Sequence, residues 1–421
     1  MQAEAAFPHT IVGMYINAST HHAQINPRDP DFYADPYPTY EHLRQTASVF
    51  YWEEFGNWSF ISQRDVTAIL RDRRFGRQIT HVISREEAGL PAERTDLKPF
   101  YDVDRYSMLE LEPPTHRRLR GLVQKAFMAR QIERLQPRIA QLSNDLIDRM
   151  IAKGEADLLA DFATPIPVFV IAEMLGVPTD MSQSLLDWSH AMVGMYQMAR
   201  SAEQEQAAVT AAQEFVAYLR EYVARRRKEP RDDLITKLIE AEENGEKLTE
   251  DELISNCILL LNAGHEATVN VVGNGVLALL NHREQLERWQ KQPDLTATAV
   301  EELLRYDTPL HLFNRWVLQD LEFGGRKFKQ GMQVSLLLGA ANRDPAVFER
   351  ADCLDIGRKK NPHVSLGGGI HYCLGAPLAR LELQTSLPIL LKRLPHLHIK
   401  QPPQFRNSYH FRGLDALHVG W

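Results

Sequence analysis

The stretch that most constrains the fold is TEDELISNCILLLNAGHEATVNVVGNGVLALLNH, which spans residues 249–282. Thr249 is followed three residues later by Glu252, which is the pattern of a capping box at a helix N-terminus. The middle of the stretch is apolar on nearly every side, so a helix formed here must be covered by other structure all around. We therefore expect the chain to fold around one long, buried helix.

The rest of the chain predicts more helices and a smaller amount of sheet. Between residues 115 and 310, several segments carry apolar residues at i, i+3 and i+4, which is typical of helices. Residues 48–62 read as two short strands, and residues 316–339 return to strand character. Residues 76–107 have weak periodicity and predict a long loop with some short helix, and such loops are often functional.

These patterns give a fold class that is mainly α with a small β portion. No repeat or clean interdomain linker divides the chain, so we predict one domain over residues 29–421, preceded by an N-terminal arm of residues 1–28.

Composition excludes several classes of protein. A formal net charge of −7 argues against general nucleic-acid binding. The three cysteines, Cys257, Cys353 and Cys373, cannot form a disulfide framework and fit a reducing compartment. The first residues do not read as a secretory signal, and no apolar run approaches the roughly 18 residues of a membrane span. We expect a cytoplasmic protein without a membrane anchor.

The segment SLGGGIHYCLGAPLAR, residues 365–380, places Cys373 between a glycine-rich loop and a helical pattern. The helix dipole and free N–H groups at a helix N-terminus stabilise a thiolate, and the glycines allow close packing against something flat or bulky. Cys373 therefore suits an axial thiolate ligand. A buried structural cysteine is the general alternative. A zinc site needs more ligands, a nucleophile paired with His371 rests on a common spacing, and a phosphate loop would carry a lysine.

The same segment resembles the haem-binding loop of the cytochrome P450 family. Leu366, Gly369, His371, Cys373 and Gly375 occupy the positions of that motif. The resemblance implies haem b (iron protoporphyrin IX), with Cys373 as the metal ligand and with Leu366, Gly367, His371 and Gly375 among the residues that bind the cofactor. Leu366 replaces the family's usual phenylalanine, a departure that bears on the reduction potential of the iron.

Two further segments resemble the family in its order. Glu302 and Arg305, three residues apart, share a helix face; such a pair is commonly a surface ion pair, but in the family it forms a buried network with an arginine of a later segment. Arg343 lies near that segment, without being assigned as the partner. In EPPTHRRLRGLVQKAF, His116 and Arg120 are four residues apart, and the resemblance implies that they bind the haem propionates together with Arg315 and His371.

Residues 263–268, AGHEAT, resemble the family's oxygen-activation segment. The small residues Ala263 and Gly264 would let a flat ring lie against the helix, and Glu266 occupies the place of the acid that relays protons from solvent. Ala267 stands where the family has a threonine, and Thr268 follows it. A shift of one residue turns a helical side chain by roughly 100°, so Thr268 is not expected to replace that alcohol directly. Three possibilities remain open: a water or substrate hydroxyl replaces it, the protein uses peroxide, or coupling is poor.

The resemblance covers nearly the whole chain and implies the family's triangular helical prism, of the soluble bacterial type. It implies a monooxygenase that inserts one atom of O₂ into a small, mostly apolar organic substrate, with electrons from a separate ferredoxin and an NAD(P)H-linked ferredoxin reductase. A peroxide-driven peroxygenase and a non-catalytic haem sensor or carrier are the alternatives. The expected substrate pocket is lined by Leu259, Ala263, His311, Leu312, Asn314, Tyr409, His410 and Phe411. A basic docking patch for the ferredoxin is expected from Arg117, Arg118, Lys125, Arg358, Lys359 and Lys360.

Overall fold

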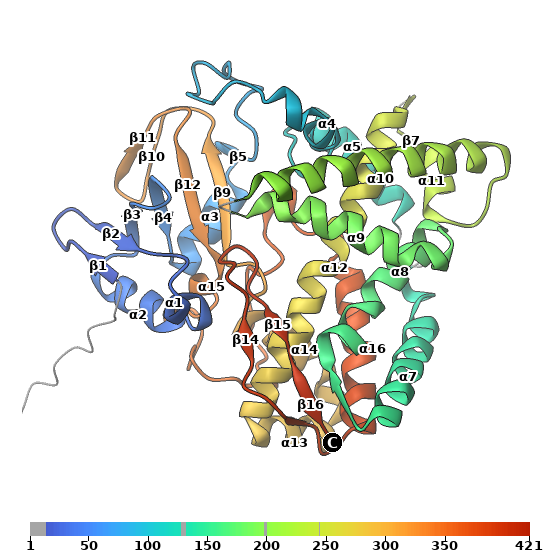
Figure 1. Ribbon diagram of the computed structural model, residues 1–421. Helices are drawn as coiled ribbons and strands as arrows, with labels where there is room; N and C mark the ends of the chain where they lie inside the picture. Colours follow the sequence, from blue (N-terminus) through green and yellow to red (C-terminus); the bar gives the residue numbers. More distant parts are fainter. Residues whose placement is uncertain (1–13, 128–131, 198–199, 244) are drawn as a thin grey trace, which may run out of the picture.

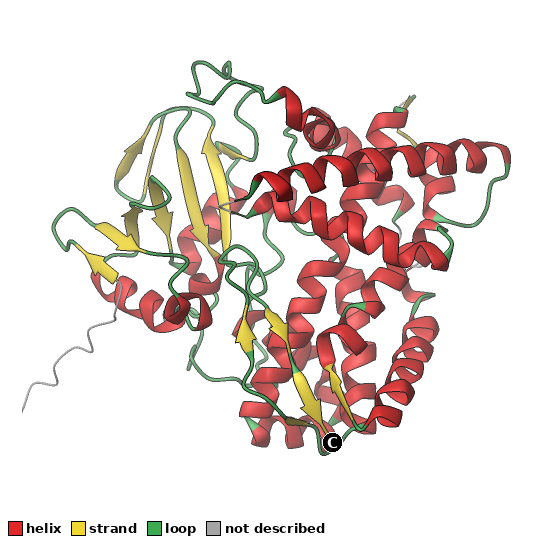
Figure 2. Ribbon diagram, in the orientation of Figure 1, coloured by secondary structure: helices red, strands yellow, loops and turns green. Residues whose placement is uncertain are grey.

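The computed structural model describes residues 14–127, 132–197, 200–243 and 245–421. Helices make up most of the molecule, and the larger sheet lies to one side of them (Figure 2). The fold class predicted from the sequence, mainly α with a small β portion, is confirmed.

The long apolar stretch forms helix α12, Glu250–Asn281, and the predicted capping box of Thr249 and Glu252 is present. Its neighbours cover it on several sides, and two of them, α9 and α10, run side by side across one end of it (Figure 1). The packed neighbours are α8 (Pro165–Leu175), α9 (Ser182–Val193), α10 (Ala202–Lys228), α14 (Thr296–Tyr306) and α16 (Ala376–Arg393). Within the described residues, no helix has both the length and the apolar character needed to cross a bilayer.

A seven-stranded sheet with the order β1-β2-β3-β4-β12-β9-β5 forms most of the β-rich part. Its strands are β1 (Met14–Ile16), β2 (His22–Ile25), β3 (Val49–Trp52), β4 (Asn57–Phe60), β5 (Phe75–Gly76), β9 (Leu312–Val317) and β12 (Gln333–Leu337). The two strands predicted within residues 48–62 are β3 and β4. In the described part of the predicted arm, β2 pairs with β3 and β1 pairs with β2, so both strands extend the sheet.

Shorter elements complete the fold. The remaining helices are α1 (Pro30–Ala34), α2 (Tyr37–Thr46), α3 (Gln63–Arg71), α4 (Lys98–Arg105), α5 (Thr115–Ala126), α7 (Gln136–Lys153), α11 (Leu234–Glu240), α13 (Arg283–Lys291) and α15 (Leu338–Ala341). The remaining strands are β6 (Glu155–Asp157), β7 (Glu242–Glu243), β8 (Glu246–Lys247), β10 (Leu321–Phe323), β11 (Arg326–Phe328), β13 (His398–Ile399), β14 (Gln404–Phe405), β15 (Leu414–Ala416) and β16 (His418–Gly420). The loop predicted for residues 76–107 contains only α4 and one 3₁₀ turn, Thr95–Leu97.

Glu302 and Arg305 of α14 are fully buried and form a two-pronged ion pair, with both N···O distances 2.8 Å. The third member of this network is Arg358, whose Nε donates to Glu302 at 3.0 Å. Arg343 instead stacks on the rings of Tyr37 and Tyr306. Because a buried ion pair needs further hydrogen bonds to offset its desolvation, this network fixes the segment that leads into the cysteine loop.

Candidate functional site

The cysteine loop is held against α3 by close backbone contacts. Gly369 has φ +65°, and a Cβ on it would lie 2.1 Å from the carbonyl oxygen of Leu70. The backbone N–H of Cys373 donates to the carbonyl of Leu366 at 2.9 Å. Only glycine adopts this positive φ readily and has no Cβ to collide with Leu70. Gly369 therefore fixes where Cys373 lies.

The surroundings of Cys373 pull its ionisation in opposite directions. Burial raises the pKa of the thiol, while N–H groups of Gly375 and Ala376 and the charge of Arg120 lower it. These three groups favour the thiolate, but burial outweighs them, so the pKa of Cys373 stays above its usual value without a bound cation. A thiolate here becomes fully favourable when a cation binds to the sulfur.

Arginine and histidine side chains gather beside this loop. Arg120 Nη2 donates to the carbonyl of Tyr372 at 2.6 Å. The rings of His116 and His371 lie 4.4 Å apart, and His371 Nε2 contacts Glu112 Oε1 at 3.1 Å. Burial, with Arg120 and His371 nearby, lowers the pKa of His116 to about 4, and its Nε2 has no hydrogen-bond partner among the described residues. Three of the four predicted propionate ligands, Arg120, His116 and His371, therefore lie together at the cysteine loop.

Arg315, the fourth predicted propionate ligand, is a buried cation that pairs with no carboxylate among the described residues. Its side chain is buried in β9, and burial, with Arg77 nearby, lowers its pKa to about 9. Its only hydrogen bond within the described part of the chain runs to the carbonyl of Asn314, and no acid there lies in ion-pair range. A buried guanidinium in this state calls for an anionic partner. The donor set therefore fits a ligand that carries carboxylates, as haem does.

Two residues of this cluster were not predicted. Glu112 accepts from His371 and from the backbone N–H of Arg77, and Arg77 pairs with Glu110. Glu112 is the first residue of the EPPTH segment, so this acid lay within a motif that the sequence had already indicated. Nothing in the sequence connects Arg77 with β9, because the contact is formed only by the pairing of β5 with β9.

One face of α12 is open at its centre. Ala263 is exposed, and Leu259 and Ala267, four residues away on either side, are half-buried. Residues spaced by four lie on one helix face, so these three share a surface that the described residues cover only in part. Gly264 also lies close to α8, because a Cβ there would lie 3.0 Å from Ile171 Cδ1. Its small size allows α8 and α12 to pack.

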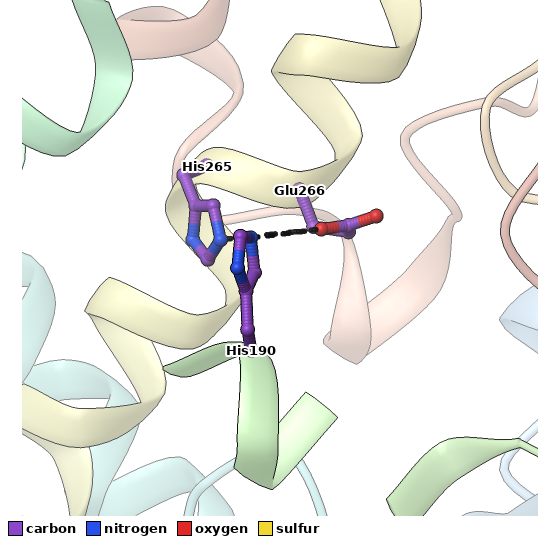
Figure 3. A group of neighbouring side chains, drawn as sticks. All are labelled: His190, His265 and Glu266. Atoms are coloured by element: carbon purple, nitrogen blue, oxygen red, sulfur yellow. Dashed lines mark ion pairs between the residues drawn. The ribbon is translucent and has the colours of Figure 1, made fainter. Parts of the chain in front are cut away.

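Glu266 points away from this open face, into a polar cluster. Arg406 Nη1 donates to Glu266 Oε1 at 2.5 Å, and the other oxygen faces the rings of His190 and His265 (Figure 3). Thr268 is buried, and its hydroxyl donates to the carbonyl of Gly264 at 3.4 Å. The expectation that Thr268 does not take the place of a threonine at position 267 therefore agrees with its geometry. Arg406 and His190 carried no signal in the sequence.

The predicted pocket residues separate into two groups. His311 and Tyr409 both hydrogen-bond the hydroxyl of Tyr40 at 2.8 Å, and they pack with Leu312 in the core of the β-rich part. Asn314 is exposed and accepts from Ser335. The side chains of His311, Leu312 and Tyr409 are thus used in packing, and contact of these four residues with a substrate stays a prediction.

His410 and Phe411 remain half-exposed beside each other, with ring centroids 4.6 Å apart. Burial, with Arg77 nearby, lowers the pKa of His410 to about 4, which places this ring near the cationic cluster. Leu259, Ala263, His410 and Phe411 stay as candidates for contacts with a substrate.

The predicted docking patch also changes. Arg358 is used in the Glu302 network, and Arg118 pairs with Glu252. The exposed members are Arg117, Lys125, Lys359 and Lys360.

Comparison with known proteins identifies the family. A family model described as Cytochrome P450 matches residues 75–410. The chain is 39% identical to the polyketide biosynthesis cytochrome P450 PksS of Bacillus subtilis (strain 168), covering 94% of this chain and 98% of that protein. It is also 39% identical to the mycinamicin IV hydroxylase/epoxidase of Micromonospora griseorubida, covering 82% and 84%.

Solved structures give the same result. The structure of P450BioI, in complex with acyl carrier protein ligated to hexadec-9Z-enoic acid, has a TM-score of 0.87 and 38% identity, and covers 93% of this chain and 99% of that one. The structure of the bacillaene polyketide synthase cytochrome P450 PksS has a TM-score of 0.84, covering 94% and 99%. The agreement extends over sequence, fold and nearly the full length, so the chain belongs to the cytochrome P450 family, whose members are haem-binding monooxygenases.

Proposed function

We propose that this chain holds haem b through Cys373 and inserts one atom of O₂ into an apolar acyl or polyketide-type chain. The observation that carries the proposal is Arg315, a buried cation near His371 of the cysteine loop that has no acid partner in the described residues. Arg120, His116 and His371 would share the two propionates with it.

The bound haem would supply the oxygen chemistry, and thiolate ligation favours O–O cleavage. The task of the loop is to keep Cys373 as a thiolate, through the N–H groups of Gly375 and Ala376 and the charge of Arg120. Leu366 packs against the helical core beside the loop, so it provides bulk without an aromatic ring.

Glu266 is the proposed proton carrier. Its side chain is 8% exposed, yet it contacts His190, which is 51% exposed, at 4.0 Å. Protons would reach the carboxylate from solvent along this side, and rotation of the carboxylate away from Arg406 would present it toward the open face of α12. Ala267 lies on that face without a hydroxyl, so a complete path would need a water or a substrate hydroxyl there.

The substrate class is supported by the relatives and by the open face. One relative is named for polyketide biosynthesis, and another structure holds a hexadecenoyl group on its carrier protein. Leu259, Ala263 and Ala267 offer small apolar contacts along α12, and Phe411 adds an aromatic one. Such a surface suits an extended aliphatic chain.

Electrons would come from a ferredoxin and its reductase. Arg117 lies one turn before Arg120, whose guanidinium contacts the cysteine loop, and Lys359 and Lys360 follow the Glu302 network just before that loop. These exposed cations would attract an acidic partner to the side of the thiolate.

A carbon monoxide difference spectrum of the reduced protein tests the proposal. We expect a red-shifted Soret band of the thiolate type, and its loss in Cys373→Ser but not in the matched control Cys353→Ser. Titration with fatty acids of increasing length should then shift the oxidised haem from low to high spin. A wild-type band typical of histidine or neutral-thiol ligation would refute ligation by Cys373.

A peroxide-driven reaction is the second candidate, because the hydroxyl of Thr268 is used inside the helix and Ala267 has none. Turnover with hydrogen peroxide alone, compared with turnover with ferredoxin, reductase and NAD(P)H, separates the two. The presence of Glu266 favours the O₂ route.

A further inference from the structure

Two histidines and one glutamate converge where α9 meets α12. His190 Nε2 lies 4.0 Å from Glu266 Oε2, and His265 Nε2 lies 3.9 Å from the same oxygen. All three ligand atoms fall within 4.8 Å of one another, and the two rings turn toward the carboxylate (Figure 3). The α9 and α12 helices pack together, so the cluster is built on two rigid elements.

His265 supplies a buried lone pair that has no partner. Its ring contacts the carbonyl of Leu261 through Nδ1 at 3.1 Å, so Nδ1 carries the hydrogen and Nε2 is left as an acceptor. The residue is 1% exposed, and no donor reaches Nε2 among the described residues. Histidines that bind metals usually donate their other nitrogen to a carbonyl in this way.

Glu266 is also held as a ligand carboxylate would be. Arg406 Nη1 donates to Oε1 at 2.5 Å and orients the group, which leaves Oε2 directed at the two imidazoles. The positive charge of Arg406 offsets the negative charge of Glu266, so charge attraction adds little to the binding of a divalent cation. Such a cation would be held mainly by coordination to nitrogen and oxygen. That preference selects ions such as Zn²⁺, Co²⁺ or Ni²⁺ over Mg²⁺ and Ca²⁺, which take oxygen ligands.

We propose that His190 Nε2, His265 Nε2 and Glu266 Oε2 form a binding site for a divalent transition-metal ion of the zinc type. Ligand atoms about 2.1 Å from a tetrahedral ion are separated by roughly 3.4 Å, so each histidine nitrogen must move closer to Glu266 Oε2 by about half an ångström. The exposed side chain of His190 is free to make that movement. The same exposure leaves a fourth position for water.

Binding at this site has a consequence that rests on the proposed function. The ion would occupy the oxygen of Glu266 that faces His190, which is the side from which protons are proposed to arrive. Zinc would then inhibit oxygenation reversibly, and ligation of haem by Cys373 would not change.

Calorimetric titration of the chelator-treated holoenzyme with ZnCl₂ tests the site. We expect one tight site in the wild type and an affinity lower by about 100-fold or more in His190→Ala, which removes one ligand on the surface. His396→Ala, which removes an exposed histidine elsewhere, should bind zinc as the wild type does. Equal affinity of wild type and His190→Ala would overturn the proposal.

X-ray absorption at the zinc edge gives a second readout that does not depend on activity. The loaded wild type should show two imidazole ligands and at least one oxygen ligand, and a spectrum with no imidazole would also overturn the site. The ratio of turnover with and without zinc should fall for the wild type more than for His190→Ala. Zinc bound by two imidazoles without any effect on turnover would support the metal site and count against proton transfer through Glu266, which separates the two proposals.

Discussion

Arg315 carries a positive charge into the core of the molecule, beside the cysteine loop's cationic cluster. Its nearest charged neighbours within the described residues include Arg77, which raises the cost of burying it, and Glu112 and Glu110, which act only through space. A residue in that position is useful when an anion binds next to it. The charge of Arg315 is therefore best explained by the carboxylates of a ligand.

We predict that Arg315→Met loses haem faster than the wild type. Methionine keeps an unbranched apolar stem and removes the charge, so the loss of one charge-assisted hydrogen bond should raise the rate of haem dissociation by about 10-fold or more. Transfer of haem to excess apomyoglobin measures the rate. Arg105→Met, at an exposed position on α4, is the control and should behave as the wild type. An unchanged rate in Arg315→Met would remove the assignment of Arg315 as a propionate ligand.

Ala267 is the second residue whose change is informative. It lies on the open face of α12 with Ala263, whereas Thr268 is turned into the helix packing and bonds the carbonyl of Gly264. We predict that Ala267→Thr raises the product formed per NAD(P)H several-fold, because it places a hydroxyl on the open face. Parallel assays of product and NAD(P)H consumption measure the coupling.

Thr268→Val is the matched control for that change. It removes a hydroxyl that is already bonded within the helix, so coupling should stay as in the wild type. If Ala267→Thr leaves the coupling unaltered, a water or a substrate hydroxyl already fills this role.

At the scale of elements, Glu301 connects α14 to the cysteine helix. Its carboxylate accepts from Arg380 of α16 at 2.6 Å and contacts His363, which precedes the cysteine loop, at 3.0 Å. Burial alone raises the pKa of Glu301, but the hydrogen bonds from Arg380 and His363 outweigh it and lower the pKa to about 2. The ionised form of Glu301 is therefore more favourable in the folded protein than in the unfolded chain, so ionisation of this carboxylate stabilises the fold.

The lowered pKa of Glu301 predicts the pH range over which its contacts with Arg380 and His363 stabilise the folded protein. Because the folded pKa lies below the ordinary value of 4.5, the contribution is present above that value and is lost as the pH falls toward 2. Glu301→Gln should be less stable than the wild type by about 1 to 3 kcal/mol above pH 5, and the difference should shrink between pH 4.5 and 2. Urea unfolding at several pH values measures it. The exposed Glu284→Gln is the control, and a difference independent of pH would contradict the electrostatic origin.

The elements predicted from the sequence were those specified by neighbouring residues. The capping box of Thr249 and Glu252 lies within one turn at the start of α12. The cysteine loop was also predictable, because its glycines and its thiol form one short motif.

Contacts between distant segments were not predictable in the same way. Arg358 reaches Glu302 across 56 residues, and Arg406 reaches Glu266 across 140. An arginine on the surface and an arginine in such a network look alike in a single sequence, because only tertiary packing decides which carboxylate each one meets. For the same reason the sequence did not indicate that His311 and Tyr409 bond Tyr40, which lies 271 and 369 residues away.

At the scale of the whole molecule, a net charge of −7 coexists with exposed cations near the cysteine loop. A protein that is acidic overall repels an acidic partner from most directions, so a local basic surface selects one direction of approach. Arg117, Lys359 and Lys360 are the exposed positions beside groups that contact or support this loop. The proposed acidic ferredoxin would meet the molecule there, where the path to the thiolate is short.

We predict that the triple variant Arg117→Glu, Lys359→Glu and Lys360→Glu receives the first electron more slowly at low ionic strength, by about 10-fold or more. The rate should also lose its dependence on salt, because salt screens an attraction that the variant no longer has. Stopped-flow reduction under carbon monoxide at several salt concentrations measures both effects. Lys327→Glu changes an exposed charge on the β10–β11 hairpin and should keep the salt dependence of the wild type. Since the carbon monoxide spectrum reports the haem itself, an unchanged spectrum in the triple variant shows that slower reduction arises from docking. If the triple variant is reduced at the wild-type rate with the wild-type salt dependence, the partner docks elsewhere on the molecule.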